Sequence, residues 1–519
     1  MGNKQPKNNK KDNSKNKNKK EEEENEDEVE EEFFDDNITS KKKDNPSSLG
    51  LEHNPIISEL KSDPFLDYVI IKKLGAGSFA TVHLVKHKVS GAIRAMKAIN
   101  KGNSEEDNEL EIINEINILM KMDHPNIVKI FEFYNSPSCY YLITEFCEGG
   151  SLFDLIKDKG AMTEIQASYI MHQLFSVVNY CHKMKIIHRD LKPENILINK
   201  YENDLATIKV CDFGTSLCFK TGEIQDKIVG SIYYIAPEVI KKRYNSKCDL
   251  WSCGVIMYIL LTGVPPFGGA RNDIIIKKIL LGVYDKTRLK RRCRACIDLI
   301  DKLLQQDITK RIRADAALKH KWFQIYKSKE IRVDIEDPKI IEGYLRNLKN
   351  YKKSSQIQEI ALAYLVHNHL ELEDVDNASK LFGIIDKNGN GKITKEDLYN
   401  GLKEFYKSET LKEDVDKIFE NLDNTGSKYL DYEEFIRAAI DKSIFLTDEN
   451  MIFAFNYFDK DGKGEITIDD LCSIFSGGVL SKSDLEKTRN IIKEVSSSHD
   501  EKIRFKEFCG IMKTFISSQ

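Results

Sequence analysis

The sequence predicts an α+β protein in which a small strand-rich lobe is followed by a larger helical lobe and then by an all-α domain. Between residues 68 and 145, short β-branched and aromatic runs are separated by turns that contain glycine. Beyond residue 150 the apolar residues recur mainly at helical spacing. From residue 386 onward, a twelve-residue polar loop returns at intervals of 37 and 36 residues, which indicates a repeated unit.

Length and composition limit the classes of protein that fit. The chain has 519 residues, of which 41% are hydrophobic and 31% charged. At roughly 150 residues per domain, this length predicts three to four domains. The composition is that of a soluble globular protein and excludes fibrous and membrane-spanning classes. Because 79 basic and 83 acidic residues leave a net charge of −4, no global field favours nucleic acid as a partner.

The cysteines and the apolar runs indicate a cytoplasmic protein. Eleven cysteines are too few for a disulfide scaffold, and the first residues lack the apolar segment of a secretion signal. The one close pair, Cys293 and Cys296, has no second pair to complete a zinc site, so we expect it to be incidental. The longest apolar run, over 255–261, is about a third of the ~20 residues that cross a bilayer.

Residues 1–60 predict a disordered charged tail. A basic block extends through Lys20 and gives way to an acidic run over 21–32, so little apolar surface is available to offset the entropy of ordering. The first two residues, Met and Gly, resemble the start of an N-myristoylation signal, but Pro6 stands where Ser or Thr is required. Weak membrane association through this tail therefore stays open.

The strand-rich lobe is expected to contain five strands and one helix. The helix is predicted over 109–122, because Ile112, Ile116 and Leu119 recur at helical spacing. The strands are predicted over 68–74, 80–86, 94–99, 127–134 and 140–145.

A glycine-rich turn, GAGSFATV at 75–82, joins the first two predicted strands. A dinucleotide-binding turn would open a helix instead, and glycines of this kind let backbone N–H groups approach phosphates closely. Lys97 on the next strand is in a position to reach nucleotide phosphates, and Glu115 on the following helix is in a position to hold its ammonium group. Taken alone, each of these features also fits a tight hairpin or a solvated surface.

Two further motifs supply the groups that phosphoryl transfer needs. They are HRDLKPEN at 188–195 and DFG at 212–214, followed by APE at 236–238, DLW at 249–251 and Arg311. Because the transition state of phosphoryl transfer is loose, the required parts are a proton acceptor, metal ligands and cations that neutralise charge. With these motifs in this order, residues 68–323 resemble the eukaryotic protein kinases, which implies the two-lobed protein kinase fold.

The resemblance implies a role for each matching residue. Asp190 would be the catalytic base, Lys192 would stabilise the transferred phosphoryl group, and Asn195 and Asp212 would hold two Mg²⁺ ions. Asp249 would anchor the catalytic loop. The residues expected to bind ATP are Leu74, Gly75, Ala76, Gly77, Ser78, Phe79, Ala80, Thr81, Val82, Ala95, Lys97, Glu115, Glu145, Cys147 and Leu197. Glu238 and Arg311 would form a structural ion pair, and because base, metal ligands and ATP lysine are all present, a pseudokinase is disfavoured.

Two positions bear on specificity within this resemblance. Lys192 is the residue that distinguishes Ser/Thr kinases from Tyr kinases, and Ser151 stands where related calcium-regulated kinases usually carry Glu, so a relaxed preference for basic substrates is expected. Thr144 is a small residue before the hinge. Arg189 would meet either a phosphorylated activation segment or an acidic substitute; the candidates are Thr215, Ser216, Thr221 and Ser231 for phosphorylation, and Glu223 and Asp226 as acidic partners.

The first polar loop, over 386–397, fits the EF-hand. Oxygen-bearing side chains stand at its first, third and fifth places, Gly391 makes the turn, and a carboxylate closes the loop. The expected calcium ligands are Asp386, Asn388, Asn390, the Lys392 carbonyl and Asp397. Because Asp397 is one methylene shorter than the usual Glu, we expect it to bind through one oxygen and to accept Mg²⁺ more readily.

The other loops depart further from the pattern. Loop two offers Asp423, Thr425, Ser427, Tyr429 and Glu434, but Lys428 replaces the turning glycine. Loop three offers Asp459, Asp461, Glu465 and Asp470, but Lys463 puts a cation where an oxygen belongs. The fourth copy, from Ser496, is expected to bind nothing. Loop one is thus ranked first for calcium, then two, then three, and pairing of the units predicts lobes over 375–443 and 446–519.

The junction over 324–374 carries an apolar helical stripe beside basic residues. The apolar members are Tyr344, Leu345, Leu348, Tyr351, Ile360, Leu362 and Leu365, and the basic ones are Arg346, Lys349, Lys352 and Lys353. A basic amphipathic helix is a usual target of a calcium-sensor groove. A kinase, a basic junction and a calmodulin-like domain of four EF-hands, in this order, resemble the calcium-dependent protein kinases of plants and protists over 68–519.

This second resemblance implies a Ser/Thr protein kinase activated by Ca²⁺ binding to its own EF-hands, with ATP, Mg²⁺ and Ca²⁺ as cofactors. Without Ca²⁺ the junction and sensor would hold the kinase inactive, and bound Ca²⁺ would open a sensor lobe that recaptures the junction. Protein substrates and a monomeric state are expected. Two alternatives stay open: a kinase whose degenerate EF-hands no longer regulate it, and a calcium-binding scaffold with little catalysis.

Overall fold

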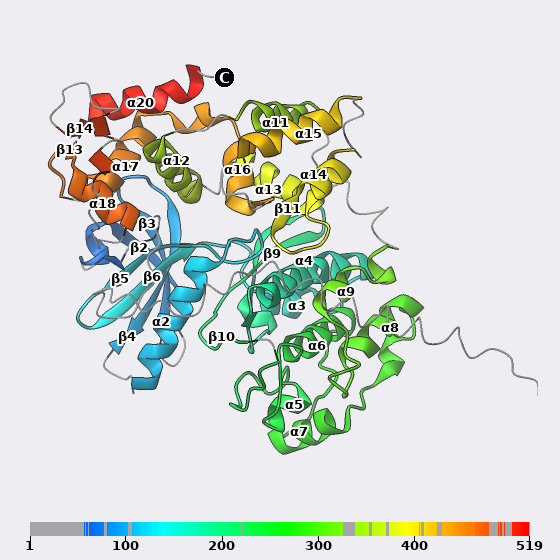
Figure 1. Ribbon diagram of the computed structural model, residues 1–519. Helices are drawn as coiled ribbons and strands as arrows, with labels where there is room; N and C mark the ends of the chain where they lie inside the picture. The colour runs from blue at the N-terminus through cyan, green and yellow to red at the C-terminus, as the bar shows by residue number, and fades with distance from the viewer. Residues whose placement is uncertain are drawn as a thin grey trace, which may run out of the picture. The chain divides into compact units, whose positions relative to one another are not determined.

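The computed structural model describes residues 57, 59–60, 62–76, 80–101, 106–220, 222–324, 338–351, 355–369, 373–403, 405, 409–422, 428–459, 461–476, 486, 488–489, 492–493 and 501–517 (Figure 1). The tail predicted over 1–60 falls outside these residues except at Ile57, Glu59 and Leu60. Gly77, Ser78 and Phe79 of the glycine-rich turn, and residues 496–500 at the start of loop four, also lie outside them.

A six-stranded sheet forms the N-terminal lobe of the described chain, in the order β1-β5-β6-β4-β3-β2. Its strands are β1 (Glu59–Leu60), β2 (Tyr68–Ala76), β3 (Ala80–His87), β4 (Ile93–Asn100), β5 (Ile130–Asn135) and β6 (Cys139–Glu145). All five predicted strands are present. The fifth was predicted to begin too early, because Ile127 leaves the sheet and bridges Val210 of the other lobe, so that β5 begins only at Ile130.

Helix α2 (Glu106–Lys121) lies beside this sheet, close to the predicted range. Its predicted apolar residues Ile112, Ile116 and Leu119 are all buried. The sheet contributes a hydrophobic core of its own, made by Tyr68, Val85, Met96, Phe131, Tyr134 and Ile143. The helical spacing read from the sequence therefore marked the buried face correctly.

The C-terminal lobe is mainly helical. Its elements are α3 (Leu152–Lys159), α4 (Glu164–Lys183), β7 (Ile186–Ile187), β8 (Ile196–Glu202), β9 (Leu205–Val210), β10 (Leu217–Cys218), α5 (Pro237–Ile240), α6 (Cys248–Thr262), α7 (Asn272–Leu281), α8 (Arg294–Leu303) and α9 (Ala314–Leu318). Short 3₁₀ turns occur at Pro64–Leu66, Pro193–Asn195, Lys286–Leu289 and Lys442–Phe445. Helix α6 is buried on all sides, so it forms the centre of this lobe.

The CxxC pair has a local structural role. Cys293 is the N-cap of α8, and its Sγ accepts a hydrogen bond from the backbone N–H of Cys296 at 3.3 Å. None of the eleven cysteines, all of which are described, is joined in a disulfide. The pair is therefore part of a helix start.

The sensor consists of two pairs of EF-hand units. The first contains α13 (Glu373–Ile385), β11 (Lys392–Thr394), α14 (Lys395–Leu402), α15 (Leu411–Leu422), β12 (Tyr429–Asp431) and α16 (Tyr432–Ala439). The second contains α17 (Asp448–Phe458), β13 (Glu465–Ile466), α18 (Ile468–Ser476), β14 (Ile503–Arg504) and α20 (Phe505–Ser517). Each twelve-residue loop has an aliphatic residue at its eighth place. Within each pair these residues face each other across a two-stranded ladder, Ile393 with Leu430 and Ile466 with Ile503.

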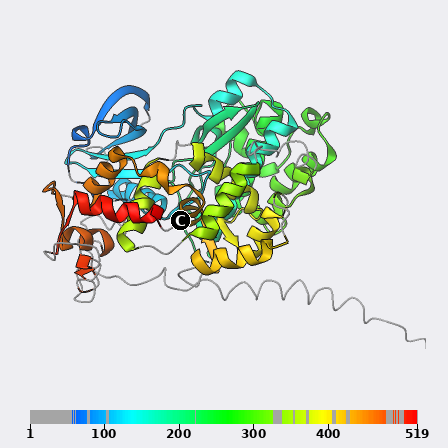
Figure 2. The ribbon, with the colours of Figure 1, turned by 90° about the horizontal axis from the view of Figure 1, so that it is seen from above.

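The predicted junction stripe is divided between two helices, α11 (Pro338–Asn350) and α12 (Gln356–Asn368). Ser355 caps α12 with a reciprocal bond to Gln358, which starts a new helix after Tyr351. The stripe is buried in the sensor's hydrophobic core, where α11 packs on α15 and α16 and α12 packs on α16, α17 and α20. Figure 2 shows both junction helices among the sensor helices. Lys352 and Lys353 lie outside the described residues.

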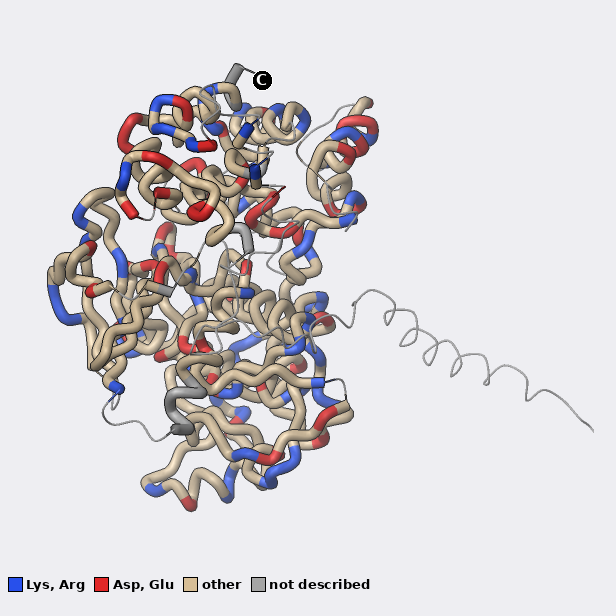
Figure 3. Tube along the Cα trace, turned by 60° about the vertical axis from the view of Figure 1, so that its left-hand side comes forward, with Lys and Arg blue, Asp and Glu red and all other residues tan. Residues whose placement is uncertain are grey.

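Charged residues of both signs are interspersed along the described trace (Figure 3). No helix among the described residues is long and apolar enough to span a bilayer.

Candidate active site and calcium loops

The lysine expected to bind ATP is held by two carboxylates. Lys97 on β4 donates to both carboxylate oxygens of Glu115 on α2 at 2.9 Å and to Asp212 Oδ1 at 3.2 Å. Burial alone would lower the pKa of Lys97, but the two carboxylates outweigh burial and raise it. The strand and the helix thus bring together Lys97 and Glu115, as the sequence predicted.

The backbone of the catalytic loop is held by Asp249 of α6. Its buried carboxylate accepts the backbone N–H groups of His188 at 3.1 Å and Arg189 at 2.9 Å, and it bonds His182 Nε2 at 2.9 Å. Burial by itself would raise the pKa of Asp249, but these hydrogen bonds and nearby histidine charges lower it. The anchoring role expected for Asp249 matches this geometry.

Asp190 lies at the centre of a small polar network. Lys192 Nζ donates to Asp190 Oδ2 at 2.5 Å, and Asn195 Nδ2 donates to the Asp190 carbonyl at 3.0 Å. Ser231 donates to Asp190 Oδ1 from both its backbone N–H and its hydroxyl, each at 2.9 Å, and Lys192 Nζ donates to Ser231 Oγ at 3.1 Å. Ser231 was predicted only as a phosphorylation candidate, whereas here it positions the base and the lysine.

The close approach of Ser231 depends on Gly230. This glycine has φ +98°, and a Cβ there would lie 2.6 Å from the Arg189 carbonyl oxygen. Only glycine lets the activation segment pass this near to the catalytic loop. The glycine directly before Ser231 is the one sequence signal that would have identified the contact.

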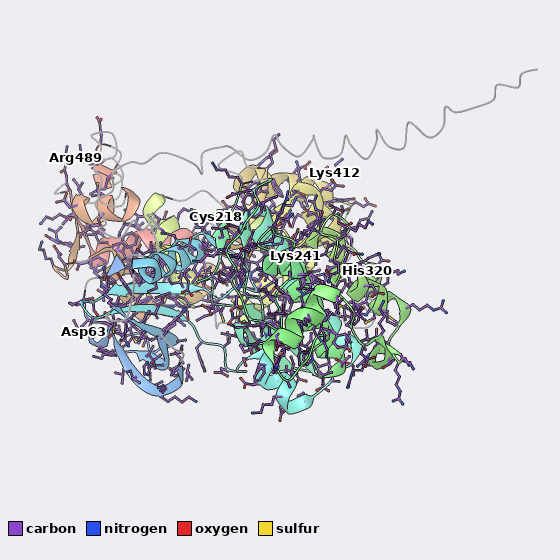
Figure 4. The ribbon with its side chains drawn as sticks, turned by 90° about the horizontal axis from the view of Figure 1, so that it is seen from below. Asp63, Cys218, Lys241, His320, Lys412 and Arg489 are labelled. Carbon is purple, nitrogen blue, oxygen red and sulfur yellow. The ribbon has the colours of Figure 1, made fainter. Side chains whose placement is uncertain are left out.

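Arg189 does not meet an acidic substitute. It donates to the Thr215 carbonyl at 2.6 Å and to the Tyr244 hydroxyl at 3.4 Å. Glu223, a predicted partner, accepts the backbone N–H of Lys220 instead. Figure 4 labels two residues of the neighbouring chain, Cys218 of β10 and Lys241 directly after α5. Thr221 lies outside the described residues.

The oxygen ligands expected for Mg²⁺ fit that ion. Asp212 has φ +63°, which turns its carboxylate toward Lys97, and the charge of Lys97 keeps the pKa of Asp212 low although burial opposes this. Asn195 uses its amide nitrogen on Asp190, so its amide oxygen is the atom that suits a metal. Carboxylate and amide oxygens are the ligands that Mg²⁺ prefers.

The residues expected to bind the nucleotide come from β2, β3, β4, α2, the hinge and β8. Val82 lies opposite Lys97 and Leu84 lies opposite Ala95 in the β3–β4 ladder, while Leu197 bridges Ser151. Leu74, Gly75 and Ala76 end β2, Ala80 and Thr81 begin β3, and Cys147 follows β6.

The side chain of the hinge residue Glu145 is paired within the protein. The carboxylate of Glu145 is buried in an ion pair with Lys209 at 2.9 Å, so any contact with a nucleotide comes from its backbone. The structural ion pair expected in the large lobe is present, because Arg311 Nη2 donates to Glu238 Oε2 at 2.9 Å and both side chains are buried.

Calcium loop one has the internal hydrogen bonds of an EF-hand. The buried Asp386 accepts the N–H groups of Gly391 at 2.7 Å and Asn390 at 3.2 Å, and burial raises the pKa of Asp386 to about 6. Asp397 Oδ2 accepts from Thr394 at the start of α14, while Asp397 Oδ1 accepts from Asn388 Nδ2 at 3.2 Å. One oxygen of Asp397 thus caps the helix, and only the other faces the loop.

The donor set of loop one fits a hard cation. Besides two carboxylates it offers the Asn388 and Asn390 amide oxygens and the Lys392 carbonyl, and such oxygens suit Ca²⁺ and Mg²⁺. Within the described ranges no group of three or more His, Cys, Asp or Glu side chains converges on one point. Loop one therefore relies on amides and a carbonyl in addition to its acids.

Loops two and three carry the defects expected from their lysines. In loop two, Lys428 adopts φ +62° without being glycine, while Asp423, Thr425 and Ser427 lie outside the described residues. Glu434 and Asp431 cap α16 reciprocally. In loop three, the ammonium group of Lys463 forms an ion pair with the carboxylate of Asp461, a predicted calcium ligand. The other bonds of loop three match those of loop one, since Asp459 accepts the Gly464 N–H and Asp470 caps with Thr467. The side chain of Glu465, whose carbonyl holds the seventh place, pairs with Lys502.

Comparison with known proteins follows this geometry. The chain matches the protein kinase domain over residues 68–323 and the EF-hand domain pair over 376–440 and 448–513. It is 37% identical over 454 residues to calcium-dependent protein kinase 4 of Plasmodium berghei (strain Anka), covering 85% of each chain. It is 34% identical over 464 residues to calcium-dependent protein kinase 33 of Arabidopsis thaliana, covering 88% of this chain and 87% of that one.

Proposed function

The chain belongs to the calcium-dependent protein kinases, and from this premise we propose a residue-level account of its catalysis and calcium control. It is a Ser/Thr protein kinase that uses ATP and Mg²⁺ and is regulated by Ca²⁺ through its own EF-hands. The observation that carries the account is the network in which Asp190, Lys192, Asn195 and Ser231 hold one another within hydrogen-bond distance.

In the proposed mechanism Asp190 accepts the proton of the substrate hydroxyl as that oxygen attacks the terminal phosphorus of ATP. Lys192, which bonds Asp190 Oδ2 at 2.5 Å, neutralises charge on the transferred group. Lys97 orients the phosphates while Glu115 holds its ammonium. Mg²⁺ held by Asn195 and Asp212 would neutralise the remaining phosphate charge.

We propose that Ca²⁺ acts through the contact between sensor and junction. Burial of Leu345, Leu348 and Leu365 in the sensor core supports an arrangement in which the sensor holds the junction away from the substrate cleft. The pair of Lys97 and Glu115 is formed in this arrangement, which is therefore the active one. Ca²⁺ bound by loop one would increase the fraction of molecules that adopt it. Loop two ranks second and loop three third, because of Lys428 and of the Lys463–Asp461 ion pair.

The test is a radiolabelled-ATP assay on a peptide substrate, with chelator and with Ca²⁺, run beside Asp190→Asn. Activity that rises with Ca²⁺ and disappears in Asp190→Asn supports the proposal. Equal activity in both conditions would indicate EF-hands that do not regulate. Calcium binding without transfer would indicate a scaffold.

The ranking of the loops has its own matched pair of variants. Asp386→Ala should raise the Ca²⁺ concentration for half-maximal activity at least tenfold, because it removes a carboxylate ligand of loop one. Asp461→Ala should change that concentration less than twofold, because Lys463 already neutralises this carboxylate. The reverse order would contradict the ranking.

Substrate preference is proposed to be relaxed toward basic residues. Ser151 caps α3 through a reciprocal bond with Asp154 and brings no carboxylate to a substrate arginine. A peptide array that showed strict dependence on Arg three residues before the acceptor would contradict this.

We also propose that the protein works as a cytoplasmic monomer with at most weak membrane association through its tail. The support is the set of eleven cysteines outside any disulfide and the imperfect acylation motif at Pro6. Sedimentation and flotation with anionic vesicles test the two parts.

A further inference from the structure

Calcium loop one is in direct contact with the kinase lobe. Asn179, a buried residue of α4, donates its Nδ2 to the backbone carbonyls of Asn388 at 2.9 Å and Gly389 at 3.0 Å. These are the third and fourth places of the loop. A side chain of the catalytic domain thus holds the backbone of a calcium-binding loop more than 200 residues away.

The contact is so close that it needs glycine at two places of the loop. At Gly389, with φ +57°, an added Cβ would lie 2.8 Å from Leu318 Cδ1 and 3.0 Å from Ser176 Oγ. At Gly391, with φ +72°, it would lie 2.6 Å from Cδ2 of the Tyr180 ring. Ser176, Asn179 and Tyr180 of α4 therefore form a wall against loop one, which we call the α4 wall.

Loop three shows that this closeness is not a general property of the EF-hand turn. Gly462 and Gly464 occupy the same fourth and sixth places, with φ +67° and +79°, and a Cβ on either would meet nothing within 4 Å. The internal bonds agree, since Asp386 Oδ2 and Asp459 Oδ2 each accept a sixth-place N–H at 2.7 Å. The two turns are alike, and of these two only that of loop one packs against the kinase.

In the docked loop, two of the expected calcium ligands are joined to each other. Asn388 Nδ2 lies 3.2 Å from Asp397 Oδ1, which joins the third and the closing places across the loop. Fixing the backbone of a loop residue costs about 1–2 kcal/mol, so contacts that fix it beforehand leave less for the ion to overcome. The α4 wall thus favours a loop that is ready for the ion.

We propose that the α4 wall is an outer part of calcium site one, with Asn179 as its positioning residue. Docking of the sensor on the kinase then raises the Ca²⁺ affinity of loop one, and Ca²⁺ in loop one strengthens docking by the same factor. The proposal rests on the proposed function, in which loop one is a calcium site. It goes further by making the catalytic domain part of the sensor's calcium affinity.

The first experiment measures Ca²⁺ binding to the full chain by competition with a chromophoric chelator. Asn179→Ala should lower the affinity of the tightest site about fivefold to tenfold, because two hydrogen bonds to the loop are lost. Activity at saturating Ca²⁺ should persist, since Asn179 touches no catalytic group. An unchanged affinity would overturn the proposal.

Lys200→Ala is the matched control. Lys200 pairs with Asp376 of α13 at 2.8 Å, so it joins kinase to sensor without contacting loop one. This half-exposed pair should shift the affinity less than twofold. Equal shifts in Asn179→Ala and Lys200→Ala would assign the effect to docking in general and would overturn the role of the α4 wall.

A second readout separates packing from backbone strain. Gly389→Ala and Gly462→Ala both place a Cβ at positive φ, but only the first meets the kinase. Amide hydrogen exchange is followed over residues 123–135 of the kinase. There Lys129 donates to Glu433 of the sensor at 2.5 Å, and His367 of α12 bonds the Ile130 carbonyl at 2.9 Å. Exchange there should rise in Gly389→Ala and stay unchanged in Gly462→Ala. Equal behaviour of the two variants would overturn the proposal.

Two further variants keep the outcome unambiguous. If Asn179→Ala fails to fold, Asn179→Leu fills the same volume without donors and takes its place. Asp386→Ala separates the two levels of inference. If it leaves Ca²⁺ binding unchanged, loop one is not a calcium site and the proposed function is wrong. If it abolishes the tightest site while Asn179→Ala does not weaken it, only the present inference is wrong.

Discussion

The hydroxyl of Ser231 lies between the two charged groups of the catalytic loop, bonded to Asp190 Oδ1 at 2.9 Å and to Lys192 Nζ at 3.1 Å. Ser231→Ala should lower kcat about tenfold, since one well-placed hydrogen bond contributes about 1 kcal/mol or somewhat more. The KM for ATP should not change. Steady-state kinetics check this, and Ser231→Thr should keep most activity.

An opposite result would assign Ser231 to regulation. If the hydroxyl were a phosphorylation switch, Ser231→Asp would activate the enzyme and Ser231→Ala would fail only after pre-incubation with ATP. The structure favours positioning, because Ser231 is engaged by the base through its backbone as well as its hydroxyl.

His124 makes the fold sensitive to acid. Its Nδ1 accepts the Asn126 N–H at 3.0 Å and its Nε2 bonds Ser176 Oγ at 2.9 Å, so a second proton would face a donor. Burial lowers the pKa of His124 to about 3, from a value near 6.5 when unfolded. Between these values only the unfolded state binds the proton, and stability should fall by about 1.4 kcal/mol per pH unit as pH drops below 6.5.

Urea unfolding midpoints between pH 7 and 5 measure this sensitivity. His124→Gln keeps an acceptor and a donor but cannot be protonated, so its midpoint should change less over the same range. An equal slope in both proteins would assign the acid sensitivity to other groups.

At the scale of elements, Cys293 starts helix α8 as its N-cap, with Sγ 3.3 Å from the Cys296 nitrogen. Cys293→Ser should keep the stability or raise it by up to about 0.5 kcal/mol, because Ser is a preferred cap, whereas Cys293→Ala should lose about 1 kcal/mol. Chemical denaturation of the two variants measures the difference. A large loss in Cys293→Ser would instead indicate that the thiol has a role of its own.

The EF-hand units bury their apolar residues by pairing. The register Ile393 with Leu430 and Ile466 with Ile503 joins loops in pairs, and all four side chains are fully buried. Loop four is thus retained through Ile503, although its polar part has lost the calcium pattern. The repeat in the sequence predicted this pairing because a single unit cannot bury its own apolar face.

For the whole molecule, the junction is the connection between calcium and catalysis. Leu348 of α11 is fully buried against the sensor, whereas Arg346 on the same helix is exposed. Leu348→Glu would bury an unpaired carboxylate at a cost of several kcal/mol, so α11 should leave the sensor core. Activity in Ca²⁺ should fall at least tenfold while Ca²⁺ binding persists.

Arg346→Glu is the control, because it places the same charge on the exposed face of α11. Its activity should stay within twofold of the parent chain in the same Ca²⁺ titration. If Leu348→Glu were instead active without Ca²⁺, the junction would serve only to inhibit, and capture by the sensor would not be needed.

The parts of the site that the sequence predicted are those whose chemistry depends on local spacing. Asp190, Lys192 and Asn195 lie within six residues, and loop one spans twelve, so the pattern alone identifies them. The bonds from Ser231 to Asp190 and from Lys209 to Glu145 join residues 41 and 64 positions apart, and no local pattern marks them. Sequence reasoning therefore predicted Ser231 only as a phosphorylation candidate and did not predict the ion pair between Glu145 and Lys209.

By itself the sequence determined the two kinase lobes, the catalytic loop and the positions of the calcium loops along the chain. The reason is that apolar periodicity, glycine turns and charged ligands each act within one helical turn or one loop. Only the tertiary structure decided that the junction stripe is two helices inside the sensor core and that Asn179 holds loop one from 209 residues away. The physical reason is that these contacts form between faces complete only after folding. Whether a turn such as Gly389 meets solvent or the kinase depends on packing, which its neighbours in sequence do not encode.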